Sequence, residues 1–323
     1  MSEADRLRDE AREALCHWGG ASALRLVKAR ENVVFDAMLH DGRRIALRLH
    51  RPGYQTEGAI AAELDWTARL AGAGLSVPQP VLTEGGASTV VAGGRVVSAV
   101  AWLAGAPIGS AEAPLAGTPA QQATTMLALG SLIGRLHEVT DGLRLPAGFD
   151  RPRWDTDGLL GDDPRWGRFW ENPAFDRADR RVVEKARNLA RERLAEAGAG
   201  FGLIHADCLR ENILSDGGRL SLIDFDDSGW GWRMYDLATA VFQSLEEPGL
   251  GPQSRALLAG YGALRPLPPD PERALTLFLM LRAFASAGWI MTRAAPDDPQ
   301  LPLRAARALR AARAVLAGRP AWT

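Results

Sequence analysis

Apolar and polar positions recur with two different periods in the first third of the chain. Between Leu7 and Trp18 the apolar residues are three and four positions apart, which is the period of one helix face, so residues 3–18 predict an amphipathic helix. A second helical pattern covers residues 57–71. Short apolar runs bounded by turn residues predict strands at Val33–Leu39, Arg44–Leu49, Ser88–Val91 and Arg95–Trp102. Together these elements predict a small α+β lobe built around an antiparallel sheet.

A change of composition marks the end of this lobe. The Asp41-Gly42 pair inside the lobe is a strong signal for a hairpin between the first two strands. From Gly105 to Ala120 the chain is rich in Gly, Pro, Ala and Ser, as is typical of a connector. A chain of 323 residues is also long enough for two hydrophobic cores. We therefore expect an N-terminal lobe at residues 1–104 and a C-terminal lobe at residues 105–323.

Helical periodicity dominates the C-terminal lobe, so we expect it to be mainly helical. Helices are predicted at 121–139, 176–197, 234–247, 252–263, 271–293 and 302–317. Only two short strand-like pieces, 202–204 and 220–223, interrupt these helices. Residues 150–173 are dense in Trp, Arg and Asp, and we expect an ordered surface insertion there, to which the pattern assigns no role.

Composition and charge exclude several classes of protein. A formal net charge of −1 argues against general binding to nucleic acids or to anionic membranes. The two cysteines, Cys16 and Cys208, are far apart, so neither a disulfide scaffold nor a structural zinc module is expected. The N-terminus is charged from the start, and no run of about 18 apolar residues occurs. We expect a cytoplasmic protein without a membrane segment. Its oligomeric state leaves no signal in the sequence.

Three oxygen-bearing side chains follow the two strand-like pieces of the C-terminal lobe. Asp207 comes after the first piece, Asp224 comes after the second, and Asn212 lies in the loop between them. Two carboxylates and an amide so arranged suit two tasks, holding a divalent metal on a polyphosphate and accepting a proton from a hydroxyl. This combination is the core of phosphoryl transfer. No Walker-type G-x-x-x-x-G-K-[ST] motif occurs near either of the two lysines, Lys28 and Lys185.

The spacing of these residues resembles that of a known family. His205, Asp207 and Asn212 fit the pattern H-x-D-x-x-x-x-N, and Asp224 lies in the segment LIDFDDSGWG twelve residues after the Asn. The pair of motifs resembles the aminoglycoside phosphotransferase and choline kinase family, which has a protein-kinase-like fold. The nearest branches are the RdoA/SrkA-type kinases and the type II homoserine kinases, and the order of elements matches along nearly the whole chain. In the family the loop is typically H-G-D, whereas this chain has Ala206 in the second place.

The resemblance implies a role for each residue of these motifs. Asp207 is the expected catalytic carboxylate, which orients the acceptor hydroxyl and accepts its proton, and His205 is expected to organise the loop. Asn212 and Asp224 are expected to hold Mg²⁺ against the phosphates of ATP. Asp236 matches a family Asp that braces the catalytic loop.

In the N-terminal lobe the resemblance implies nucleotide binding. Arg48 occupies the place of the usual ATP-binding Lys, and Glu63 matches the acid that pairs with it. Three residues, Trp102, Leu103 and Ala104, are expected to meet the adenine at the hinge. Two features depart from kinase patterns: a planar guanidinium replaces the compact ammonium, and the G-x-G-x-x-G loop is missing.

The two acids after Asp224 bear on the choice of acceptor. Asp226 lies on the same side of an extended strand as Asp224, so we expect it to contribute to a second metal position. With Asp227 it forms an acidic mouth, which favours an amine-bearing acceptor; a solvated acidic turn is the alternative. Trp230 and Trp232 either line the acceptor pocket or pack beneath the loop.

The leading hypothesis is an ATP- and Mg²⁺-dependent phosphotransferase acting on a hydroxyl of a small molecule of the aminoglycoside, homoserine or choline type. A protein Ser/Thr kinase of the RdoA/SrkA type is one alternative. A nucleotide-binding pseudokinase or regulatory protein, motivated by Arg48, is another. A hydrolase with His205, Asp207 and Cys208 as metal ligands is disfavoured, because adjacent side chains at a strand end point in opposite directions.

Overall fold

The computed structural model describes residues 2–29, 32–111, 113–196 and 200–323. The chain forms two compact units. The first unit contains Met1–Gly105, Leu143–Arg151 and Ser221–Asp226. The second unit contains Ala106–Gly142, Pro152–Leu220 and Asp227–Thr323. An antiparallel sheet forms the centre of the first and helices make up most of the second, which confirms the predicted α+β class.

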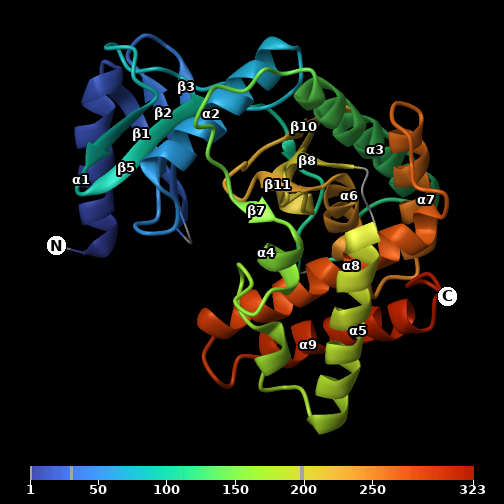
Figure 1. The fold of residues 1–323 in the computed structure, drawn as a ribbon. Helices are drawn as coiled ribbons and strands as arrows, with labels where there is room; N and C mark the ends of the chain where they lie inside the picture. Colours follow the sequence, from blue (N-terminus) through green and yellow to red (C-terminus); the bar gives the residue numbers. More distant parts are fainter. Residues whose placement is uncertain (1, 30–31, 112, 197–199) are drawn as a thin grey trace. The chain divides into compact units, whose positions relative to one another are not determined.

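The first unit is built around a five-stranded antiparallel sheet with the order β1-β2-β3-β5-β4 (Figure 1). The strands are β1 (Ala21–Ala29), β2 (Val33–Leu39), β3 (Arg44–Leu49), β4 (Thr89–Ala92) and β5 (Arg95–Ala101). The β2–β3 hairpin is the one that the Asp-Gly pair predicts. Strand β1 is absent from the prediction. It lies at the edge of the sheet, where its residues are exposed or half-buried, and its apolar residues Leu24 and Leu26 are only partly buried against the core.

Two helices complete the first unit. Helix α1 (Glu3–Leu15) begins with a capping box between Ser2 and Asp5, and its apolar face joins Phe35 and Leu47 of the sheet in one core. Figure 1 shows α1 beside the sheet. A 3₁₀ turn (Cys16–Trp18) extends this helix, so the predicted helical segment 3–18 is confirmed. Helix α2 (Glu57–Gly72) matches the second predicted helix.

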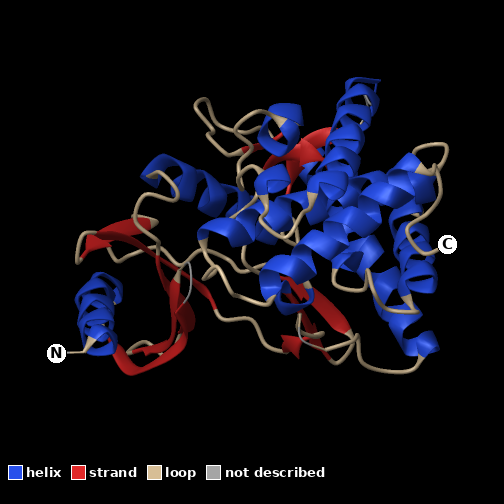
Figure 2. Ribbon diagram, turned by 90° about the horizontal axis from the view of Figure 1, so that it is seen from below, coloured by secondary structure: helices blue, strands red, loops and turns tan. Residues whose placement is uncertain are grey.

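Helices form the bulk of the second unit (Figure 2). They are α3 (Pro119–Asp141), α4 (Thr156–Leu160), α5 (Arg177–Glu196), α6 (Arg233–Phe242), α7 (Leu250–Gly262), α8 (Pro271–Trp289) and α9 (Gln300–Leu316). Helices α3 and α7 approach so closely that a Cβ on Gly130 would lie 2.0 Å from the Leu257 carbonyl oxygen, and one on Gly260 would lie 2.0 Å from that of Leu127. Glycine at both crossing points therefore permits the backbone contact.

The helical region contains more strands than the pattern predicts. Two three-stranded sheets have the orders β7-β11-β8 and β10-β9-β6. Their strands are β6 (Ala106–Pro107), β7 (Arg153–Trp154), β8 (Phe201–Ile204), β9 (Ile213–Asp216), β10 (Arg219–Leu222) and β11 (Gly229–Trp232). The prediction of only two strand pieces is thus wrong, because segments of two to four residues are too short to establish a period.

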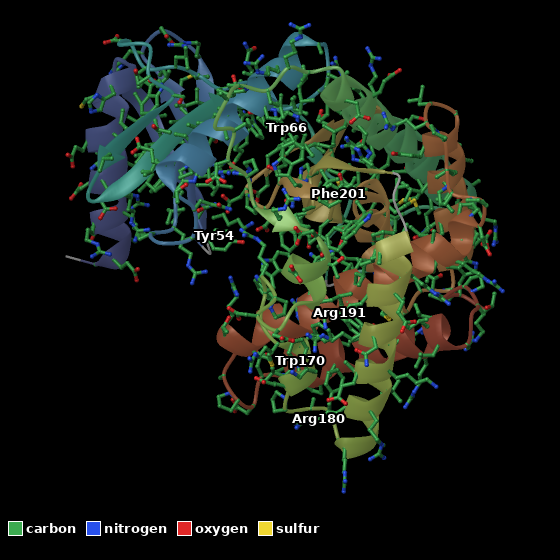
Figure 3. The ribbon with its side chains drawn as sticks, viewed as in Figure 1. Tyr54, Trp66, Trp170, Arg180, Arg191 and Phe201 are labelled. Carbon is green, nitrogen blue, oxygen red and sulfur yellow. The ribbon has the colours of Figure 1, made fainter. Side chains whose placement is uncertain are left out.

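Residues 150–173 are not a surface insertion, and that prediction is wrong too. Trp154 and Phe169 are 1% and 0% exposed. Phe169 stacks on Phe284 of α8 with 4.2 Å between the ring centroids. Trp170, labelled in Figure 3, lies beside α5, where the guanidinium of Arg187 is 3.9 Å from its ring centroid. Trp154 and Phe169 therefore belong to the core of the second unit, and Trp170 is half-buried.

One helical segment of the described chain, Pro271–Thr292, is long and apolar enough to cross a membrane by length and composition alone. However, 83% of its most apolar window is buried inside the fold. Its apolar character is therefore accounted for by its place at the centre of the second unit.

Candidate active site

The Asp207 loop begins where strand β8 ends, at Ile204. After the loop, a 3₁₀ turn (Arg210–Asn212) leads into β9. The side-chain amide of Asn212 turns back and donates to Asp207 twice, to the backbone oxygen at 2.9 Å and to carboxylate Oδ2 at 2.8 Å. The amide nitrogen is therefore directed at Asp207, which leaves the amide oxygen of Asn212 as the atom suited to a cation.

Ala206 of this loop has a left-handed backbone, with φ = +66°. An L-residue with a Cβ is disfavoured in this conformation, so surrounding contacts must hold it there. Asp236, in the first turn of α6, provides them: its carboxylate accepts the N–H of His205 at 2.8 Å and that of Ala206 at 2.6 Å. The brace that the resemblance implies for Asp236 is thus formed by two backbone hydrogen bonds.

A buried histidine completes this network. His137 Nε2 lies 3.0 Å from Asp236 Oδ2, and His137 Nδ1 lies 3.1 Å from the Tyr261 hydroxyl. Burial lowers the pKa of His137 to about 4, although Asp236 acts in the opposite direction. Burial alone would raise the pKa of Asp236, but the hydrogen bond from His137 is among the interactions that lower it overall. We infer a neutral His137 that donates from Nε2 to an ionised Asp236.

An arginine that the sequence does not single out contacts the predicted catalytic carboxylate. Arg282 Nη2, from α8, lies 3.0 Å from Asp207 Oδ1. Arg282 is only 5% exposed, and its guanidinium lies 4.9 Å from the ring centroid of Trp166 and 5.2 Å from that of Phe242. The next residue of the loop, Cys208, is fully buried, and burial raises the pKa of its thiol. Cys208 therefore packs within the fold.

The first unit brings together three other predicted residues. Arg48 of β3 donates from Nη1 to Glu63 of α2 at 3.0 Å and from Nη2 to Asp224 Oδ1 at 3.1 Å. Although burial by itself lowers the pKa of Arg48, the charges of Glu63 and Asp224 raise it overall. Asp224 also has a left-handed backbone, with φ = +65°. The planar fork of Arg48 thus joins two carboxylates at once.

Two further residues of this cluster were missed. The fully buried guanidinium of Arg151 donates to the carbonyl oxygens of Ala59 at 2.8 Å and of Asp226 at 2.7 Å. Lys28 Nζ of β1 lies 4.0 Å from Asp224 Oδ2. One signal was available for Lys28, because it is one of only two lysines among 38 basic residues. No feature of the sequence distinguishes Arg151 in this way, because the chain contains many arginines.

Asp226 does not lie on an extended strand with Asp224, so that premise is wrong. Strand β10 ends at Leu222, and Asp224 turns the chain through its left-handed backbone. Asp226 is 7% exposed and accepts from Asn32 Nδ2 at 3.0 Å, and burial raises its pKa. Its other oxygen, Oδ1, is buried without a hydrogen-bond partner among the described residues. An orphaned carboxylate oxygen beside a half-exposed carboxylate fits an oxygen-preferring cation such as Mg²⁺.

The three predicted hinge residues follow β5. The backbone N–H of Trp102 donates to the Arg44 carbonyl at 3.1 Å, and the Arg44 guanidinium lies 4.4 Å from the Trp102 ring centroid. Leu103 is half-buried and Ala104 is exposed. Their contact with a nucleotide stays a prediction.

The comparison with known proteins agrees with this arrangement. The model of the phosphotransferase enzyme family (APH) matches residues 24–277. The chain belongs to this family. The match includes the Arg48 cluster and the Asp207 loop together with Asp236.

Three similar proteins illustrate the family. The structure of the microcompartment-associated aminopropanol kinase has a TM-score of 0.82 and 30% identity, covering 96% of this chain and 98% of that one. The homoserine kinase of Mesorhizobium japonicum is 29% identical over 264 residues, 75% of this chain and 76% of its own. The amicoumacin kinase hAmiN, in complex with AMP-PNP, Ca²⁺ and Ami, has a TM-score of 0.75 at 20% identity and covers 99% of this chain and 95% of its own.

These similarities confirm the protein-kinase-like fold and the enzyme class. The phosphotransferase is an ATP-dependent kinase that phosphorylates hydroxyl groups of small molecules. The protein-kinase and pseudokinase alternatives are therefore set aside. Two separate clusters of this kinase carry the predicted site residues. His205, Asp207, Asn212 and Asp236 lie together in the second unit, and Arg48, Glu63, Asp224 and Asp226 lie together in the first.

Proposed function

We propose that this kinase transfers the γ-phosphate of ATP to the hydroxyl of a small amine-bearing molecule, with Asp207 as the residue that receives the hydroxyl proton. The observation that carries this proposal is the fixed orientation of the Asp207 carboxylate. Asn212 holds one of its oxygens at 2.8 Å and Arg282 holds the other at 3.0 Å. A carboxylate held in this way acts by position more than by basicity.

The reaction forms a bond between the acceptor oxygen and the γ-phosphorus and breaks the bond from that phosphorus to the bridging oxygen of ADP. Asp207 orients the hydroxyl and takes its proton, and His205 supports the loop. We assign Asn212, Asp224 and Asp226 to oxygen ligation of Mg²⁺. When bound, the metal neutralises charge on the phosphates.

The first unit contributes nucleotide contacts in this proposal. Arg48, paired with Glu63, is directed to the phosphates, and Trp102 to Ala104 meet the adenine through backbone groups. We therefore retain residues 1–104 as a nucleotide-binding lobe and residues 105–323 as a catalytic and acceptor-binding lobe.

Similarity to kinases with amine-bearing acceptors supports the choice of substrate class. Aminopropanol and homoserine, the acceptors in the names of two similar kinases, each combine a hydroxyl with a primary amine. Asp227, which is half-buried two residues before β11, is our candidate partner for the amine.

A screen of hydroxyl compounds for ADP release with Mg-ATP tests the proposal. Amino alcohols, hydroxy amino acids and aminoglycosides are compared with sugars and polyols that have no nitrogen. We expect turnover only with amine-bearing compounds, and a preference for nitrogen-free acceptors would overturn the assignment. Asp207→Asn is expected to reduce turnover by about 10²- to 10⁴-fold while nucleotide binding persists.

A further inference from the structure

Two arginines of the second unit, the buried Arg282 and the half-buried Arg304, each have a buried side-chain N–H without a hydrogen-bond partner among the described residues. Arg282 of α8 pairs with Asp207, but its Nε is buried and has no partner among the described residues. Arg304 of α9 has an Nε in the same condition. A buried N–H without an acceptor costs free energy, so a native structure is expected to supply one in some state of the protein.

A hydrogen bond joins Arg304 to the helix that carries Arg282. Arg304 Nη1 donates to the Ser286 hydroxyl at 2.6 Å. Ser286 is four residues after Arg282 on α8, and residues with this spacing are neighbours on one helix face. Burial, together with the positive charges of Arg282 and Arg307, lowers the pKa of Arg304 to about 10. The two guanidinium groups are thus close enough to repel each other.

Charge at this place is not balanced by the fold. Among the residues that the structure describes, Arg282 has one carboxylate partner within 4.0 Å, Asp207. The interactions of Arg304 in the described chain are with a hydroxyl and with the ring of Trp289, whose centroid lies 4.9 Å from the guanidinium. The negative charge of Asp298 raises the pKa of Arg304, but no ion pair joins the two side chains in the described structure. Between them, the two guanidinium groups thus pair with one carboxylate of the described chain, that of Asp207. One positive charge is left for a ligand to neutralise.

Aromatic rings restrict how these groups can be approached. Trp166 faces the guanidinium of Arg282 and Trp289 faces that of Arg304. When a ring covers the flat face of a guanidinium, the N–H groups along the edge of the guanidinium plane are the ones that a ligand meets. Two such N–H groups can pair with the two oxygens of a carboxylate.

We propose that Arg282 and Arg304 form a carboxylate subsite beside Asp207, so that the acceptor is a hydroxy amino acid. The inference rests on the proposed function, because Asp207 marks the position of the acceptor hydroxyl. The hydroxyl is directed to Asp207 while the carboxylate of the same molecule takes the free donors of the two arginines. Plain amino alcohols lack the group that this subsite binds.

Matched pairs of acceptors test the subsite directly in the wild-type enzyme. Homoserine and 3-aminopropan-1-ol differ only by the carboxylate, as do threonine and 1-aminopropan-2-ol, and serine and ethanolamine. In the pair that contains the best acceptor, we expect kcat/KM to be about 10- to 100-fold higher for the amino acid. Equal values, or a higher value for the amino alcohol, would overturn the subsite.

Substitution of Arg304 then tests whether this residue causes the preference for the amino acid. Arg304→Gln is expected to lower kcat/KM for the amino acid by at least about tenfold, mainly through KM, and to change the value for its amino alcohol by less than about twofold. Arg304→Lys, which keeps the charge, should recover part of the loss. Arg310→Gln replaces an exposed arginine of the same helix and serves as the control. Equal losses for both members of a pair with Arg304→Gln would count against carboxylate binding.

The outcomes separate this inference from the proposed function. If nitrogen-free acceptors are preferred, the proposed function fails. If an amino alcohol is phosphorylated better than its amino acid, the proposed function stands and the subsite fails. Should Arg304→Gln not fold, the wild-type comparison of matched pairs and the Arg304→Lys variant still decide the question.

Discussion

Asp207 and Asp224 are each paired with an arginine. Asp207 follows a residue with a left-handed backbone, and Asp224 has such a backbone itself. The two carboxylates are nevertheless held in different ways. The Asp207 loop depends on a fully buried network in which Asp236 accepts two backbone N–H groups and a neutral His137. Asp224 depends on charges, with Arg48 on one oxygen and Lys28 near the other, and its side chain is 31% exposed.

The two carboxylates therefore differ in how easily their contacts can change. The contacts that hold the Asp207 loop are fixed, and those of Asp224 can be exchanged. A buried network is costly to break, because every lost partner leaves an unsatisfied group. Half-exposed ion pairs are weak and can trade one partner for another. We infer that the Asp207 loop keeps its geometry throughout turnover, whereas Asp224 can exchange Arg48 for a metal ion.

The largest effect is expected from Asp236→Ala. The substitution strands three buried donors, so we expect a loss of about 3–5 kcal/mol of unfolding free energy, measured by urea denaturation. Asp36→Ala is the control, because Asp36 also pairs with two cationic groups, Arg25 and Arg44, whose side chains are 67% and 45% exposed. Its loss should be about 1 kcal/mol or less. Equal losses of unfolding free energy in the two variants would contradict the difference between the buried network and the exposed ion pairs.

Acidification is expected to have the next largest effect. Burial lowers the pKa of His137 to about 4 and that of His50 to about 3, with the positive charges of Arg48 and Arg151 adding to the effect at His50. Below about pH 6.5 the unfolded chain therefore binds protons that the folded chain does not, and stability falls as the pH falls. Each histidine contributes up to about 1.4 kcal/mol per pH unit between about pH 6.5 and 5.

Urea midpoints at pH 7, 6 and 5 measure this loss. His137→Asn should reduce the dependence of stability on pH over this range, whatever its effect at pH 7. An unchanged slope would show that His137 is protonated in the folded state.

A smaller effect is expected from Arg48→Lys. A lysine lacks the fork that holds Glu63 and Asp224 together, so Asp224 should bind metal with less competition. We expect the Mg²⁺ concentration for half-maximal activity to fall about two- to fivefold. Arg43→Lys, in the exposed turn before β3, is the control. A rise in the Mg²⁺ requirement would indicate that Arg48 assists metal binding instead.

The smallest effect is expected from Ala206→Gly. Glycine adopts φ = +66° without steric cost, whereas the loss of a buried methyl group and the greater freedom of the unfolded chain offset part of this gain. We expect a net stabilisation of about 0.5 kcal/mol in urea denaturation. A loss above about 1 kcal/mol would mean that the methyl group matters more than the backbone strain.

Local patterns predicted most of the fold, because helix periodicity and a turn dipeptide act over few residues. The β2–β3 hairpin and the long helices were found in this way. Strand β11, with the sequence Gly-Trp-Gly-Trp, was missed because its pairing with β7 and β8 involves residues far away in the chain.

The candidate site was predicted where residue types occur at fixed spacing. The spacing of His205, Asp207 and Asn212 along the chain was enough to predict the loop that carries Asp207. The contact of Asp207 with Arg282 spans 75 positions, and one arginine stands out little in a chain whose 38 basic residues include only two lysines. Long-range partners of this kind become visible only once the helices are packed.

The buried thiol at Cys208 gives the enzyme a built-in reporter. Cys16 is exposed and Cys208, next to Asp207, is not, so an alkylating reagent should modify one sulfur in the native enzyme and both after denaturation. The rate at which the second sulfur becomes reactive then measures how often the segment that carries Asp207 opens. A nucleotide or acceptor that slows this labelling would reveal its own binding without any assay of phosphate transfer.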